Sequence, residues 1–96
     1  MESLLEDKNI DAIVVSTPVP THYEVGRRVL ESGKHAMIEK PMTFDYEEAR
    51  QLRDLAESLD LVLTVGHVYQ FSPAVEWLAA RISSGRLGKL FHFDSR

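Results

Sequence analysis

The sequence predicts an α/β protein built on a parallel β-sheet. Three short apolar runs, rich in β-branched residues, alternate with segments whose apolar residues recur at helical spacing. The first run lacks the polar alternation of a one-sided strand, which indicates a strand covered on both faces. The order strand, helix, strand, helix, strand is typical of right-handed crossovers in a parallel sheet.

The first strand is expected at Asp11–Ser16, where Ala, Ile and Val residues follow one another. It ends at Thr17–Pro20, because a loop with two prolines cannot continue a strand. Thr21 and Glu24 have the spacing of a capping box, which predicts that a helix starts at Thr21. Gly33 follows this helical segment and is expected to end it in a left-handed conformation.

The second strand is expected at His35–Glu39 and stops at Lys40-Pro41. Proline cannot donate to the ladder and keeps the preceding residue extended. Asp45 and Glu48 form another capping box, and Leu61–Gly66 is the third predicted strand. The helix between them has a periodic apolar face formed by Ala49, Leu52, Leu55, Ala56 and Leu59.

A third helix and a final strand follow. Ser72 is the expected N-cap, with Pro73 at the first helical position, and Gly85 is expected to end the helix. Lys89–Asp94 then alternates two phenylalanines with other residues, which predicts a strand with one apolar face.

The composition excludes several classes of protein. With 96 residues the chain forms one domain at most, and no apolar run approaches the ~20 residues of a membrane span. The net charge of −4 argues against nucleic acid as a partner, because phosphate binding needs a basic face. The absence of cysteine excludes disulfides and thiolate catalysis, and the cytoplasm is the expected compartment. The histidines have no metal-ligand spacing, so no metal site is predicted.

The ends of the three predicted strands indicate a binding site. Ligands of parallel α/β sheets bind just beyond the carboxyl ends of the strands. Here those ends are Ser16–Pro18, Glu39–Pro41 and Gly66-His67, which should lie along one rim. Lys40 is therefore a candidate site residue. The alternative is a solvated surface lysine that precedes a strand-terminating proline.

Four groups of residues resemble the Gfo/Idh/MocA family of NAD(P)-dependent oxidoreductases. They are Ile13–Pro18 with Thr21-His22, Gly33–His35 with Glu39–Pro41, Gly66-His67 with Phe71–Val75, and Gly85–Lys89. The resemblance covers nearly the whole chain, and its Glu-Lys-Pro segment is the most specific part. It implies a Rossmann fold, NAD or NADP as cofactor, and hydride transfer at a hydroxyl carbon of a sugar, cyclitol or nucleotide-sugar. It also implies a homo-oligomer for the full-length family member.

The resemblance implies roles for individual residues. Lys40 would be the catalytic residue, which contacts the substrate hydroxyl and the nicotinamide side of the cofactor. Alternatives stay open elsewhere: Glu39 as a surface carboxylate, His22 in a capping and loop role, and His67 as a structural histidine. The residues implied to bind the cofactor are Ser16, Thr17, Pro18, His22, Glu39, Lys40, Pro41 and His67.

One family feature has no counterpart in the sequence. The family begins with a strand and a G-x-G-x-x-G turn that seats the pyrophosphate, and the five glycines of this chain lack that spacing. We therefore interpret residues 1–84 as the second half of a dinucleotide-binding domain, strands 4-5-6 of the doubly wound fold. Residues 85–96 would be the start of a C-terminal α+β domain. The isolated chain is then expected to be inactive. The alternative is a non-catalytic α/β module that binds a nucleotide or associates with a partner.

Overall fold

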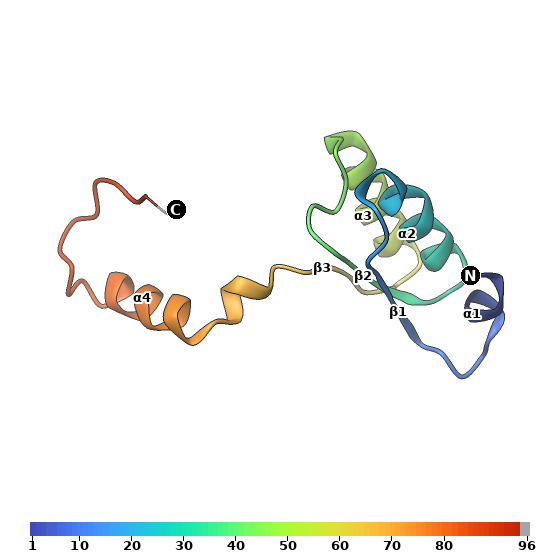
Figure 1. Ribbon diagram of the computed structural model, residues 1–96, viewed down its shortest axis with the longest axis horizontal. Helices are drawn as coiled ribbons and strands as arrows, with labels where there is room; N and C mark the ends of the chain where they lie inside the picture. Colours follow the sequence, from blue (N-terminus) through green and yellow to red (C-terminus); the bar gives the residue numbers. More distant parts are fainter. Residues whose placement is uncertain (95–96) are drawn as a thin grey trace. The chain divides into compact units, whose positions relative to one another are not determined.

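A computed structural model describes residues 1–94 of the chain (Figure 1). The chain divides into two compact units, Met1–Gly66 and His67–Arg96. The first unit contains the sheet, and the second contains one long helix. Each unit is described by itself.

The first unit contains a three-stranded parallel sheet in the order β1-β2-β3. The strands are β1 (Ala12–Val15), β2 (His35–Ile38) and β3 (Leu63–Val65). In the register, Val15 lies opposite Ile38, which in turn lies opposite the last residue of β3. The predicted α/β class and the parallel sheet are confirmed.

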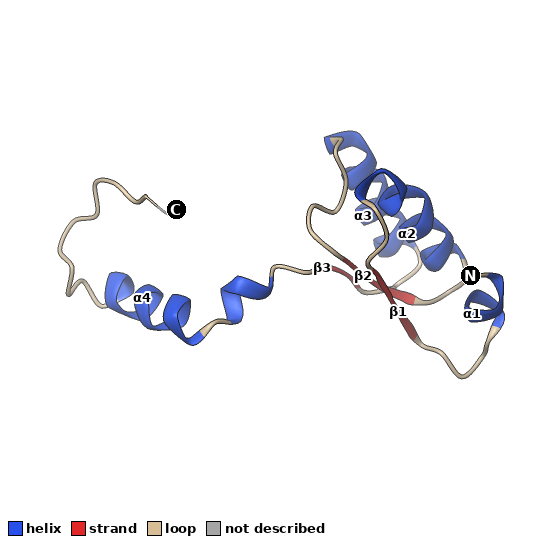
Figure 2. Ribbon diagram, in the orientation of Figure 1, coloured by secondary structure: helices blue, strands red, loops and turns tan. Residues whose placement is uncertain are grey.

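Helices cover one face of this sheet (Figure 2). They are α2 (His22–Glu31) and α3 (Tyr46–Ser58), which pack against each other, and the short α1 (Glu2–Glu6) adds a side chain to the same core. The prediction that the first strand is covered on both faces is wrong within the described residues. Val14 on the opposite face is 63% exposed, because no helix of this unit lies over it.

The core lies between the sheet and the two helices. A glycine lets them approach closely: a Cβ atom built on Gly26 of α2 would lie 2.6 Å from Ile38 Cδ1 of β2. Ordinary carbon contacts are ~3.5–4.0 Å, so no larger residue fits there without movement. The fully buried hydrophobic residues are Val15, Val29, Leu30, Ala36, Ile38, Leu52 and Ala56.

The helix starts of the first unit agree only partly with the predicted capping boxes. Asp45 caps α3, since its carboxylate accepts from the backbone N–H groups of Glu47 and Glu48 at 2.7 and 3.1 Å. The box at Thr21 does not form. The hydroxyl of Thr21 instead donates to the Pro18 carbonyl at 2.7 Å, because the chain makes a 3-10 turn, η1 (Val19–Thr21), before α2.

The second unit contains the 3-10 turn η2 (Val68–Phe71) and the helix α4 (Pro73–Ser83). Both predicted ends of this helix are confirmed. The hydroxyl of Ser72 accepts from the backbone N–H of Val75 at 3.3 Å, and Gly85 follows the helix with a φ of +71°.

The strand predicted at Lys89–Asp94 is not formed in the part of the chain that the structure describes. A strand needs a neighbour for its backbone groups, and none of the described residues supplies one. Leu90 and Phe93, three residues apart, instead line a shallow groove with apolar residues of α4. Ser95 and Arg96, which the predicted second domain includes, lie outside the described residues, and that domain boundary stays a prediction.

None of the helices within residues 1–94 combines the length and apolarity that crossing a membrane requires.

Candidate functional site

The carboxyl ends of the three strands lie side by side at one rim of the first unit. The backbone N–H of Glu39 donates to the Val15 carbonyl, and that of Gly66 donates to the Ile38 carbonyl, each at 2.9 Å. These bonds continue the parallel ladder by one residue beyond each strand. The structure therefore brings together the segments that follow β1, β2 and β3, which we call the rim.

Glu39 lies across the rim toward the end of β3. A Cβ atom built on Gly66 would be 3.2 Å from the carboxyl carbon and both carboxyl oxygens of Glu39. One of these oxygens also accepts from the backbone N–H of Lys40 at 3.2 Å. A larger residue in place of Gly66 would therefore require the Glu39 carboxylate to shift by a few tenths of an ångström, and Glu39 is half-buried.

Lys40 directly follows Glu39 at the rim, and its side chain is exposed. The peptide bond between Lys40 and Pro41 is cis. None of the ion pairs formed within residues 1–94 includes its ammonium group. An ammonium has three donors and no acceptor, so Lys40 can donate hydrogen bonds to a ligand at the rim.

The loop after β1 contributes exposed hydroxyl groups. Ser16, Thr17 and Pro18 are all exposed, and they directly follow the last buried residue of β1. The hydroxyl of Thr17 lies 2.8 Å from that of Thr21, which donates to Pro18. The loop is therefore tied to the first turn of the next helix while its outer surface stays open.

His22 lies beneath the rim. Its side chain is 1% exposed, although it comes from the first residue of α2. Nδ1 lies 2.9 Å from the Pro41 carbonyl oxygen, and Nε2 lies 2.7 Å from the Thr17 carbonyl oxygen. Both ring nitrogens are occupied by the protein, so the ring has no polar atom left for direct contact with a cofactor.

His67 belongs to the second unit, where it precedes η2 and is exposed. Its expected contact with the cofactor stays a prediction.

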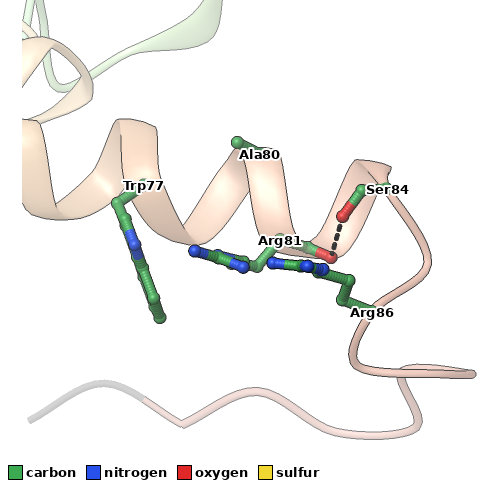
Figure 3. A pocket seen from close by; sticks show the side chains of 5 residues that line it. All are labelled: Trp77, Ala80, Arg81, Ser84 and Arg86. Atoms are coloured by element: carbon green, nitrogen blue, oxygen red, sulfur yellow. Dashed lines mark hydrogen bonds between the residues drawn. The ribbon is translucent and has the colours of Figure 1, made fainter.

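The second unit has a pocket of its own, of about 340 Å³, in which the Arg81 guanidinium lies 4.8 Å from the centre of the Trp77 ring (Figure 3). None of the residues predicted for the site lines this pocket.

The sequence did not reveal two features that shape the rim. The contact of Gly66 with Glu39 joins residues of different strands, and the bond from His22 to Pro41 spans 19 residues. Residue spacing carries no signal for either. Lys34, 6% exposed, was also missed as a buried residue, because lysine is almost always solvated. Its ammonium donates to the carbonyls of Asp7 and Ile10, each at 2.7 Å.

Comparison with known proteins identifies the family of this chain. Residues 1–67 match the model of an oxidoreductase family, GFO_IDH_MocA, with an NAD-binding Rossmann fold. This range contains every residue of the predicted site.

Three similar proteins show how much of the chain is shared. The chain is 41% identical to UDP-N-acetylglucosamine 3-dehydrogenase of Acidithiobacillus ferrooxidans over 72% of this chain and 22% of that protein. It is 32% identical to scyllo-inositol 2-dehydrogenase (NAD(+)) of Bacillus subtilis over 94% and 26%, respectively. A solved inositol dehydrogenase homologue from Azotobacter vinelandii, complexed with NAD+, superimposes with a TM-score of 0.81 at 36% identity. The superposition covers 92% of this chain and 23% of that one. The chain thus spans about a quarter of the length of the curated relatives it matches.

Proposed function

Because this chain belongs to the Gfo/Idh/MocA oxidoreductase family, with its NAD-binding Rossmann fold, we propose that the protein is an NAD(P)-dependent dehydrogenase. Its substrate would be a sugar, a cyclitol or a nucleotide-sugar, oxidised at a hydroxyl carbon. The relatives named above act on a nucleotide-sugar and on an inositol, which supports this substrate class. The observation that carries the proposal is the rim, where exposed Lys40 and the exposed loop after β1 follow adjacent parallel strands.

The residues of the rim fit a nicotinamide cofactor. Ribose hydroxyl groups both donate and accept hydrogen bonds, and the rim offers the Glu39 carboxylate as acceptor and the Thr17 hydroxyl as donor or acceptor. Gly66 leaves space beside the Glu39 carboxylate, and the backbone N–H of Lys40 donates to this carboxylate at 3.2 Å. When bound, the nicotinamide ring supplies the hydride acceptor. We assign Ser16, Thr17, Pro18, Glu39 and Pro41 to the cofactor side of the site.

Lys40 is the residue of this chain that we assign to the chemical step. Its ammonium would donate a hydrogen bond to the substrate hydroxyl and stabilise the negative charge that develops on this oxygen as its proton passes to solvent water and the hydride passes to the nicotinamide. A preorganised donor of this kind contributes roughly 10²–10³-fold to kcat. The exposed position of Lys40 suits this role, because no carboxylate of the described residues competes for its ammonium.

A substrate survey tests the proposal. The full-length protein is mixed with NAD or NADP and a panel of sugars, cyclitols and nucleotide-sugars, and cofactor reduction is followed by absorbance. We expect reduction of one cofactor with at least one class of the panel. Cofactor binding without reduction across the panel would favour a non-catalytic nucleotide-binding module instead, and absence of binding would contradict the assignment of the rim.

A further inference from the structure

We propose that His22 is a positioning residue. Its ring, which has a backbone carbonyl oxygen at each nitrogen, holds the Lys40-Pro41 turn against the Thr17–Pro18 loop, and so it sets the direction in which Lys40 leaves the rim. This inference rests on the proposed function for its effect on catalysis.

The His22 ring has a backbone carbonyl oxygen at each of its two nitrogens. The Pro41 oxygen lies 2.9 Å from Nδ1, and the Thr17 oxygen lies 2.7 Å from Nε2. A carbonyl oxygen accepts hydrogen bonds, and an imidazole N–H donates them. The ring thus lies between the two segments with a polar contact to each.

Burial makes these contacts energetically important. The His22 side chain is 1% exposed, so water has little access to replace a missing hydrogen bond. A buried polar group without a partner loses the free energy of its hydration. Separation of either carbonyl from the ring is therefore costly, which keeps the two segments together.

The position of His22 explains why it acts on the site without touching a ligand. The Pro41 carbonyl belongs to the residue directly after Lys40, and the Thr17 carbonyl belongs to the loop after β1. One ring therefore links the two segments that carry the proposed catalytic and cofactor-binding residues. Lys40 itself is exposed, and none of the ion pairs within residues 1–94 orients its ammonium, so its direction depends on its backbone. Fixing the adjacent carbonyl fixes that backbone.

The first test is spectroscopic and needs no activity. In the full-length protein labelled with ¹⁵N, a ring N–H of His22 should give a resonance that is protected from exchange with solvent, because the ring is buried with a carbonyl oxygen at each nitrogen. The resonance is assigned by its loss in His22→Asn. A ring N–H that exchanges freely with solvent would overturn the inference, whatever the enzyme's activity.

The second test separates the two hydrogen bonds. Asparagine places its amide N–H groups near the position of Nδ1, and glutamine places them near that of Nε2. His22→Asn therefore keeps the bond to Pro41, and His22→Gln keeps the bond to Thr17. Because misplacement of a reacting group by ~1 Å can cost ~10²-fold in rate, we expect His22→Gln to lower kcat by about 10- to 100-fold. We expect His22→Asn to raise the KM for NAD(P) with a smaller loss in kcat.

A purely structural role gives a different pattern. Partial unfolding lowers the active fraction, so kcat falls in both variants in proportion to lost stability, and KM is unchanged. Equal losses of kcat that follow the melting temperatures would therefore overturn the positioning role. The wild-type protein serves as the control for the proposed function: if it reduces neither cofactor, the dehydrogenase assignment fails while the spectroscopic result on His22 still stands.

Discussion

The contact between α2 and β2 at Gly26 gives the sharpest test of the fold beneath the rim. Substitution Gly26→Ala adds a methyl group 2.6 Å from Ile38 Cδ1 and 3.6 Å from Leu52 Cδ2. The second distance is an ordinary contact, but the first is about 1 Å too short. Ile38 is completely buried, so its terminal methyl group has little room to move.

The size of the effect follows from two opposing terms. Alanine in a helix is favoured over glycine by about 1 kcal/mol, whereas overpacking a core costs about 1–3 kcal/mol. We expect Gly26→Ala to destabilise the chain by up to about 2 kcal/mol. Ile38→Val removes the Cδ1 atom that the new methyl group meets, and alone it costs about 0.5–1.5 kcal/mol. In the double variant the Cδ1 atom is absent, so the added methyl group meets no clash. The higher helix propensity of alanine then stabilises the fold.

A double-mutant cycle measures this compensation. Urea unfolding of the wild type, the two single variants and the double variant is followed by far-UV circular dichroism. We expect the double variant to be more stable than Gly26→Ala alone, with a coupling free energy of about 1–3 kcal/mol. Free energies that add to within about 0.5 kcal/mol would show that α2 and β2 are not in contact at this point.

Two further predictions concern stability. Lys34→Met keeps the alkyl chain but removes the donor to the carbonyls of Asp7 and Ile10, so we expect a loss of about 1.5–3 kcal/mol in urea unfolding. The same substitution at the exposed Lys8, Lys8→Met, should change stability by less than about 0.5 kcal/mol. Equal losses in Lys34→Met and Lys8→Met would contradict a stabilising role for the buried ammonium of Lys34. The second prediction is loss of stability in acid. A hydrogen bond from the backbone of Asn9 lowers the pKa of Asp7 below its ordinary 3.8, and one from Arg50 lowers the pKa of Glu47 below 4.5. The folded state then binds fewer protons than the unfolded state, so the melting temperature should fall as the pH decreases below about 4.5, and a flat profile would refute this.

The sequence predicts the order of elements because the signals for them are local. The apolar runs of the strands, the Asp45 cap and the glycine that ends α4 are recognisable within a few residues, and the structure has all of them. The capping box at Thr21 fails because the Pro18 carbonyl takes its hydroxyl. The predicted strand at Lys89–Asp94 fails because alternation indicates a strand only where a neighbouring strand exists to pair with it.

The rim is predictable only in part. Parallel strands place their carboxyl ends together, so the sequence alone indicates that the segments around Thr17 and Lys40 are neighbours. The contact between the His22 ring and the Pro41 carbonyl joins residues 19 positions apart. The fold of the whole first unit brings this carbonyl to the ring, so no local sequence pattern predicts the contact. The same histidine was expected to contact the cofactor. That contact stays a prediction, and in the structure the buried ring has a backbone carbonyl at each of its nitrogens.

The most direct test of the account is the effect of Lys40→Ala on hydride transfer. The full-length protein, its Lys40→Ala variant and the matched exposed control Lys8→Ala are compared with the cofactor and substrate found in the survey. We predict that Lys40→Ala lowers kcat by roughly 10²–10³-fold without loss of melting temperature, and that Lys8→Ala keeps wild-type turnover. Unchanged turnover in Lys40→Ala would contradict the role of the rim in catalysis.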